Sequence, residues 1–409
     1  MKRILRVMLG VFTAIGGFVD IGDLVTNAVV GSRFGVSLAW VVVVGVVGIC
    51  VFAEMSGRVA AVSGRGTFDL VRERLGPRGG LLNLVGSVAV TLLTFIAEIG
   101  GIALAFELVS GVNYLLLVPF AAFAVWLILW RVKFSSMENT FGLAGLSLLV
   151  FAFAVWRLGP DWGELLQRAA HPAVPMGEGH PTYWYYAIAL FGAAMTPYEV
   201  FFFSSGGVEE KWSRKDLRLE RMNVFLGFPL GGLLSLSIMV CAALVMMPQG
   251  IEVNTLGQVG LPVAMALGKL GLAFALLGFV AATFGAACET GLSVGYSVAQ
   301  FYGWQWGKFV SPVRASRFHL LILISTLLAV AVLLTTVDPI KVTEYSVVFS
   351  AVALPLTYFP ILIVANDPDY MGASVNGRVA NAIGMLYLVI LTVASLAALP
   401  LMLITKAGQ

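Results

Sequence analysis

Residues 16–23 read Gly-Gly-Phe-Val-Asp-Ile-Gly-Asp, and they interrupt an apolar run that extends over about residues 7–30. Asp20 and Asp23 therefore stand where hydrocarbon depth is expected. A charged side chain at the bilayer centre costs roughly 2.5–3.5 kcal/mol on insertion scales, so it normally faces a cavity or a partner. Glycine here, above all Gly22, frees backbone groups, which membranes tolerate only beside protein or a water-lined site. We expect a broken helix whose unwound turn offers carboxylate and carbonyl oxygens to a cation.

The composition places the chain among polytopic helical membrane proteins. It has 409 residues, of which 59% are hydrophobic and 11% charged. A membrane span needs ~20 mostly apolar residues. Eleven candidate spans are centred near residues 20, 48, 96, 121, 148, 193, 236, 285, 326, 352 and 392. We therefore expect one all-α transmembrane domain over residues 1–409, with the lipid bilayer as its surroundings.

The basic residues predict the orientation in the membrane. Lys and Arg gather before span 1 and after spans 2, 4, 6 and 8, while the opposite loops carry few. By the positive-inside rule, the N-terminus is cytoplasmic and the C-terminus outside, in a plasma (inner) membrane. The net charge of +3 follows this topology, and we expect no nucleic-acid partner.

Several chemistries lack a sequence signature. The three cysteines are far apart inside apolar spans, and no zinc-ligand spacing is present. No Gly-rich phosphate loop precedes a Lys-Ser/Thr pair, so we expect no ATPase subunit to be required. We therefore expect neither an enzyme nor a bound cofactor.

A second interruption falls in the sixth span, where residues 192–199 read Gly-Ala-Ala-Met-Thr-Pro-Tyr-Glu. Pro197 removes an amide donor and clashes with the preceding turn, so it breaks or kinks this helix. Thr196 offers a hydroxyl immediately before the break, and Glu199 follows it by two residues. Interrupted hydrophobic segments at matching places in two halves are the best sequence pointer to the midplane site of a transporter. The pair predicts a cation site.

Other polar residues in the spans are candidates for an ion path. Glu98 lies near the middle of the third span, and a lone intramembrane acid is a functional hypothesis by default. Glu289 lies in the eighth span, and Glu344 with Tyr345 opens the tenth. Each is equally explained as a structural contact or a gate.

These features resemble the Nramp family of divalent-metal transporters. That family pairs Asp-Pro-Gly-Asn in span 1 with Met-Pro-His in span 6, where this chain has Asp20-Ile21-Gly22-Asp23 and Thr196-Pro197-Tyr198. Further similar segments, in chain order, are Phe34-Gly35, Trp40, Ala97-Glu98-Ile99-Gly100, Ser204-Ser205, Gly295-Tyr296, Leu354-Pro355 and Asn376-Gly377-Arg378. The resemblance covers nearly the whole chain, and the order and spacing of short motifs supply its specificity.

The resemblance implies a LeuT-type fold, a 5+5 inverted repeat with helices 1 and 6 broken. Its repeats would cover about residues 7–158 and 182–366, with an extra helix at about 379–405. It also implies roles for single residues. Asp20 matches the acidic metal ligand and Asp23 the amide ligand, Gly17 and Ala193 match positions whose carbonyls face the ion, and Glu98 matches an acid associated with proton movement.

The departures from the family motif bear on the ion. Thr196 replaces the methionine whose sulfur favours soft metals, whereas carboxylate, carbonyl and water suit Mg²⁺, Ca²⁺ and Mn²⁺. Tyr198 replaces a histidine, the natural proton switch near neutral pH. We predict alternating-access transport of Mg²⁺ or Mn²⁺ with weak or no proton coupling, similar to the Nramp-related magnesium transporters.

Two other functions remain open at this stage. The first is a sodium- or proton-coupled carrier of an amino acid or organic amine on the same fold, although three acids near the breaks would repel a carboxylate. The second is a receptor or assembly subunit that keeps the fold without transporting.

Overall fold

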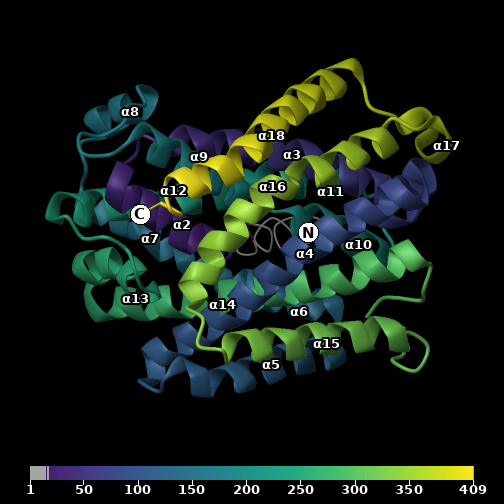
Figure 1. The fold of residues 1–409 in the computed structure, drawn as a ribbon, viewed down its shortest axis with the longest axis horizontal. Coiled ribbons are helices and arrows are strands. Elements are labelled where there is room, and N and C mark those ends of the chain that lie inside the picture. Colours follow the sequence, from purple (N-terminus) through teal and green to yellow (C-terminus); the bar gives the residue numbers. More distant parts are fainter. Residues whose placement is uncertain (1–14, 16–17, 309, 409) are drawn as a thin grey trace.

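The computed structural model describes residue 15, residues 18–308 and residues 310–408. Helices make up the described part, which contains no β-strand (Figure 1). The α-helices are α2 (Ile21–Phe34), α3 (Ala39–Ser63), α4 (Thr67–Ser110), α5 (Tyr114–Arg131), α6 (Phe134–Gly145), α7 (Leu149–Leu158), α8 (Trp162–Ala170), α9 (His180–Ala194), α10 (Pro197–Glu209), α11 (Leu217–Met222), α12 (Phe228–Val245), α13 (Leu256–Val259), α14 (Leu261–Tyr302), α15 (Ser316–Leu333), α16 (Pro339–Ala365), α17 (Pro368–Met371) and α18 (Arg378–Ile404).

Within the described residues, 10 helical segments are long and apolar enough to cross a membrane. They coincide with the second to eleventh predicted spans. The first predicted span is described only from its middle onward, where α2 covers Ile21–Phe34. The all-α, multi-pass architecture is confirmed, and the count of eleven stays a prediction.

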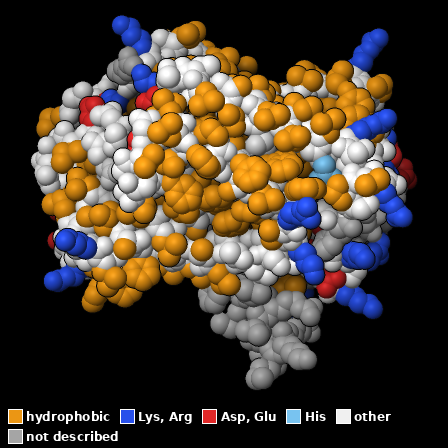
Figure 2. All heavy atoms as spheres, turned by 90° about the horizontal axis from the view of Figure 1, so that it is seen from below, with side chains coloured by type: hydrophobic (Ala, Val, Ile, Leu, Met, Phe, Trp, Pro, Cys, Tyr) orange, Lys and Arg blue, Asp and Glu red, His pale blue; other side chains and the backbone are white. Residues whose placement is uncertain are grey.

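The outer surface fits a bilayer. Hydrophobic side chains cover the middle of the face in Figure 2, and Lys and Arg side chains gather toward its two ends. In Figure 1 the long helices run between these same ends. The last span, α18, is peripheral, because only 22% of its most apolar window is buried. Its exposed side chains include Leu386, Val389, Val393 and Leu396, which face where lipid would lie.

The predicted break in the sixth span is confirmed. Helix α9 ends at Ala194 and α10 begins at Pro197, with Met195 and Thr196 between them outside helical geometry. Proline suits the first position of α10, where an amide would have no helical partner in any case. One apolar segment, His180–Glu209, thus consists of two helices.

The break in the first span lies slightly earlier than predicted. Val19 and Asp20 are non-helical, and the Asp20 side chain caps α2 by accepting a hydrogen bond from the Asp23 amide. Gly22, predicted as a helix-breaking residue, instead lies inside the first turn of α2, and that prediction is wrong. The reason for glycine here is space, since a Cβ on Gly22 would lie 2.9 Å from Cγ1 of Val347.

Helix α16 lies against both interruptions. Val347 of α16 faces Gly22 on α2, and its carbonyl oxygen would collide with a Cβ on Gly192 of α9. Helix α16 also packs along α4, the third predicted span. Two glycines therefore let one continuous helix approach two broken ones, and this contact frames the site.

Candidate functional site

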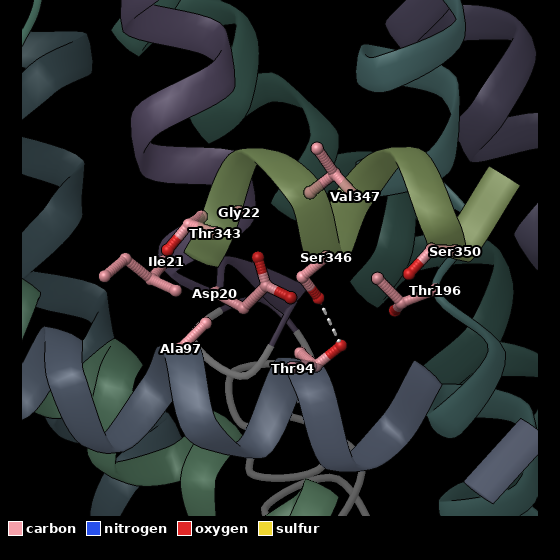
Figure 3. Close-up of a pocket in the computed structure, with 10 residues that line it drawn as sticks. All are labelled: Asp20, Ile21, Gly22, Thr94, Ala97, Thr196, Thr343, Ser346, Val347 and Ser350. Carbon is pink, nitrogen blue, oxygen red and sulfur yellow. Dashed lines mark hydrogen bonds between the residues drawn. The ribbon is translucent and has the colours of Figure 1, made fainter. Parts of the chain in front are cut away.

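A small cavity lies where the two broken helices meet α4 and α16. Its volume is ≈ 10 Å³, close to the space that a single water molecule needs. Asp20 and Thr196 come from the two breaks (Figure 3). The remaining lining residues are Ile21, Gly22, Thr94, Ala97, Thr343, Ser346, Val347 and Ser350. The sequence prediction that the breaks in spans 1 and 6 converge is confirmed.

Asp20 is the carboxylate of this cavity and is only 2% exposed. Its Oδ1 accepts a hydrogen bond from the Asp23 amide at 2.8 Å. Its Oδ2 accepts one from the Tyr198 hydroxyl at 3.2 Å, which links the two broken helices directly. A carboxylate has about four lone-pair sites, so acceptor capacity remains for a further cationic or donor partner.

The turn between α9 and α10 contributes polar groups of two kinds. In a continuous helix the Ala193 carbonyl would accept from the amide of residue 197, but Pro197 has none. The Ala193 carbonyl therefore lacks this helical donor, but Ala193 is not among the residues that line the cavity, and its role as a ligand stays a prediction. The Thr196 hydroxyl lines the cavity and donates to Oε2 of Glu199 at 3.4 Å. Glu199 itself lies in the first turn of α10 and does not line the cavity.

Asp23 points elsewhere. Its Oδ1 accepts from the Asn27 amide at 3.2 Å and from the Ser235 hydroxyl of α12 at 3.4 Å. It is 2% exposed and is absent from the cavity lining. Asp23 therefore lies on the α12 side of the site, while Asp20 faces the cavity.

Glu98 of α4 lies against the start of α2. Its Oε1 accepts a hydrogen bond from the Ile21 amide at 3.1 Å, which satisfies one of the free donors at that helix N-terminus. Its Oε2 is buried and has no hydrogen-bond partner among the described residues. The acid therefore touches the first break directly and retains a free oxygen.

The sequence interpretation missed a row of hydroxyls. Thr343, Ser346 and Ser350 of α16 line the cavity, and Ser346 shares a 2.8 Å hydrogen bond with Thr94 of α4 (Figure 3). The Ser350 oxygen is buried, and no residue in the described part of the chain hydrogen-bonds to it. Their spacing of three and four residues puts them on one helical face, a signal that was readable from the sequence.

The other predicted path residues lie outside the cavity lining. Glu289 of α14 interacts electrostatically with Asp20 but does not line the cavity. Glu344 lies among the charges of Asp338, Lys341 and Arg33, toward one end of the bundle. Tyr345 is 37% exposed, so it faces away from the site.

Two further observations concern the residues that could bind an ion. Gly17, predicted to offer a carbonyl, falls outside the described residues. Among the residues that are described, no three His, Cys, Asp or Glu side chains come close enough together to hold an ion between them. An ion here would depend on one carboxylate supplemented by hydroxyl and carbonyl oxygens.

Comparison with known proteins identifies relatives along the whole chain. The family model described as "Natural resistance-associated macrophage protein-like" (Nramp) matches residues 10–400. The divalent metal cation transporter MntH of Erwinia tasmaniensis is 26% identical over 391 residues, which cover 93% of this chain and 90% of that protein. MntH of Deinococcus radiodurans is 27% identical over 410 residues, covering 95% and 88%.

Solved structures share the fold. A mutant of the manganese transporter of Eremococcus coleocola superposes with a TM-score of 0.74 at 18% identity, covering 95% of this chain and 84% of that one. MhsT, solved in complex with L-phenylalanine, gives a TM-score of 0.63 at 15% identity, covering 98% of both chains. The expected LeuT-type fold is confirmed. With its family model spanning nearly all of the sequence and its two broken helices meeting at Asp20 and Thr196, the chain belongs to the Nramp family.

Proposed function

We propose that this protein moves a divalent metal cation across the membrane by alternating access, with the ion held between the two helix breaks. The observation that carries the proposal is the shared cavity of Asp20 and Thr196, deep among the spans. The curated relatives are named divalent metal cation transporters, which supports this substrate class.

Three groups are proposed as direct ligands. The Asp20 carboxylate supplies charge, the Thr196 hydroxyl an oxygen from the second break, and the Ala193 carbonyl a backbone oxygen freed by Pro197. Asp23 and Glu199 lie close enough to interact electrostatically, and we propose them as acids near the ion that do not contact it directly. The carbonyl of Gly17 completes the set expected from the family motif.

The donor chemistry favours a hard ion. The lining residues present oxygen and no sulfur, and carboxylate, carbonyl and water suit Mg²⁺ and Mn²⁺. The neighbouring Met195 does not change this, because its sulfur packs against Gly48 of α3. The hydroxyls of Ser346 and Ser350 add further oxygen atoms to the lining, and oxygen is the donor that Mg²⁺ and Mn²⁺ prefer. We propose Mg²⁺ or Mn²⁺ as the cargo.

The size of the cavity in this conformation favours an ion over an organic solute as the cargo. Sites for small organic ligands have volumes of roughly 300–1,000 Å³. The cavity between the breaks measures ≈ 10 Å³, the scale of an ion or a water molecule. An amino acid or organic amine therefore does not fit between Asp20 and the α16 hydroxyls in this conformation.

We further propose the predicted orientation, with the N-terminus cytoplasmic and the C-terminus outside. Arg33, at the end of the first span, donates to the Gly408 carbonyl at 2.6 Å. The end of the first span and the last described residues therefore share one side of the membrane, as an odd number of spans requires. The repeats at about residues 7–158 and 182–366 remain part of this proposal.

Coupling to protons is proposed to be weak or absent. Tyr198 stands where the family motif has histidine, and it donates its hydroxyl to Asp20. Uptake of a divalent ion down the membrane potential needs no second ion, because each charge gains about 2.3 kcal/mol per 100 mV.

Uptake of Mg²⁺ and Mn²⁺ into proteoliposomes tests the assignment. Asp20→Asn keeps an amide oxygen able to cap α2, so we expect a folded protein whose uptake falls at least tenfold. Asp161→Asn is the matched control, because Asp161 caps exposed helix α8 in the same way. Uptake by Asp20→Asn equal to wild type would refute the site. In the same vesicles, a pH-sensitive dye that reports metal-driven acidification would contradict uncoupled transport.

A further inference from the structure

Helix α8, in the connection between the fifth and sixth spans, has two chemically different faces. Its apolar face carries Trp162, Leu165, Leu166 and two alanines, and its polar face carries Glu164, Gln167 and Arg168. None of its residues is buried. Trp162 is 51% exposed and Leu166 is 65% exposed, although both are apolar. A helix with such a division and low net hydrophobicity is typical of segments lying in the plane of a membrane interface.

The surroundings of α8 carry the aromatic residues that mark a membrane boundary. Trp156, near the end of α7, is 70% exposed, and Trp184, in the first turns of α9, is 49% exposed. Trp184 packs against Trp40 at the start of α3, with ring centroids 6.3 Å apart. Tryptophan is enriched where spans leave the bilayer. In Figure 1, α8 lies at the periphery of the bundle, at the end where α9 begins, and this helix carries a further exposed tryptophan, Trp162.

The loop that follows α8 reaches a contact with the first span. Glu178 accepts from Nε and Nη2 of Arg33 at 2.8 and 3.0 Å. Arg33 also donates to the Tyr186 hydroxyl at 3.2 Å and lies over its ring. Arg33 lies in the last turn of α2, the helix whose N-terminus Asp20 caps. The loop after α8 is thus held to α2, the helix next to the cavity, through the Glu178–Arg33 ion pair.

Lipid fits this face better than a protein partner does. A stable protein interface buries about 800 Å² on each side. Helix α8 has nine residues and exposes two large apolar side chains, which is too little for such a contact. Its polar face is internally neutralised by the Glu164–Arg168 ion pair, so it offers no strong charge to a partner.

We propose that α8 lies in the headgroup–acyl boundary of the bilayer, with Trp162 and Leu166 in contact with lipid. Anchored there, it holds the following loop so that Glu178 stays paired with Arg33. Contact between α8 and lipid would thus help to hold the end of the first span, at Arg33, in its position.

Spin-label depth measurements in lipid nanodiscs test the location without depending on transport. The three native cysteines are buried, so a thiol introduced as Leu166→Cys is the exposed one, and Gln167→Cys on the polar face is its control. We expect the ratio of oxygen to water-soluble nickel-chelate collisions to be several-fold higher at position 166. Equal ratios would overturn the proposal, and so would exclusion of both reagents from position 166, which would mean a protein partner.

Hydrogen exchange tests the anchoring. Leu166→Glu should expel α8 from the boundary and raise the amide exchange of residues 171–179 several-fold, while Gln167→Glu leaves it unchanged. Should the two variants exchange alike, α8 does not hold the Arg33–Glu178 contact. Neither measurement involves metal uptake, so failure here leaves the proposed function untouched.

Discussion

Replacing Gly22 by alanine tests whether close packing around the first break shapes the site. The new Cβ would lie 2.9 Å from Cγ1 of Val347 and 3.0 Å from Oδ1 of Asp20. Non-bonded carbon atoms settle about 3.5–4.0 Å apart, so α2 and α16 must separate by roughly 1 Å or the Asp20 carboxylate must turn. Either movement reaches an atom that lines the cavity.

The expected free-energy change combines three effects. Alanine in a helix gains up to about 1 kcal/mol over glycine. Overpacking of a tight contact costs about 1–3 kcal/mol. Loss of the hydrogen bond between Asp20 Oδ1 and the Asp23 amide, which is 2.8 Å long, costs about 0.5–2 kcal/mol more. We expect a net destabilisation of about 2 kcal/mol, with at least tenfold slower uptake because a tenfold loss requires only about 1.4 kcal/mol.

The assay pairs thermal unfolding in detergent with Mg²⁺ and Mn²⁺ uptake into proteoliposomes. Gly79→Ala is the control, because Gly79 is exposed in helix α4 and a Cβ there would meet only Leu75 of the same helix. The control should melt at or above the wild-type temperature and transport normally. If Gly22→Ala matches it in both measurements, the contact with Val347 does not determine the geometry of the cavity, and the reasoning fails.

Two further predictions concern ion choice and pH. Thr196→Met places a soft sulfur at the cavity and should shift competition uptake from Mg²⁺ toward Mn²⁺ and Cd²⁺; an unchanged ranking would show that Thr196 does not face the ion. Outside the spans, burial lowers the pKa of Lys308 to about 8, and its Nζ donates to the carbonyls of Ile128 and Leu129. The unfolded chain therefore binds more protons between pH 8 and 10.5, so this group's destabilising effect is full below pH 8 and fades as pH rises. Between pH 7.5 and about 10, the melting temperature of the wild type should therefore rise relative to that of Lys308→Met. A difference in melting temperature that stays constant over this pH range would contradict the prediction.

Much of the candidate site was predictable because its chemistry is local in the chain. Pro197 ends a helix wherever it occurs in an apolar run, and an acid such as Asp20 at membrane depth demands a polar environment. Those two rules located both breaks to within a few residues, and the family motifs pointed to Asp20 and Thr196, which both line the cavity.

Other parts depended on packing that no local rule specifies. The side chains of Asp20 and Asp23 are three residues apart, yet one faces the cavity and the other Ser235 of α12. The glycine at position 22 proved to be a packing residue for Val347 rather than a helix breaker. Such choices follow from which helix lies beside each face.

The sequence by itself determined that this chain spans a membrane many times, that its first and sixth spans are interrupted, and that acids accompany both interruptions. These properties follow from hydrophobic run length, proline and the cost of charge in hydrocarbon. Only the tertiary structure decided that α16 contributes the hydroxyls of Thr343, Ser346 and Ser350 and that the cavity has the size of an ion. Both depend on contacts between segments more than a hundred residues apart, which helical periodicity and composition do not encode.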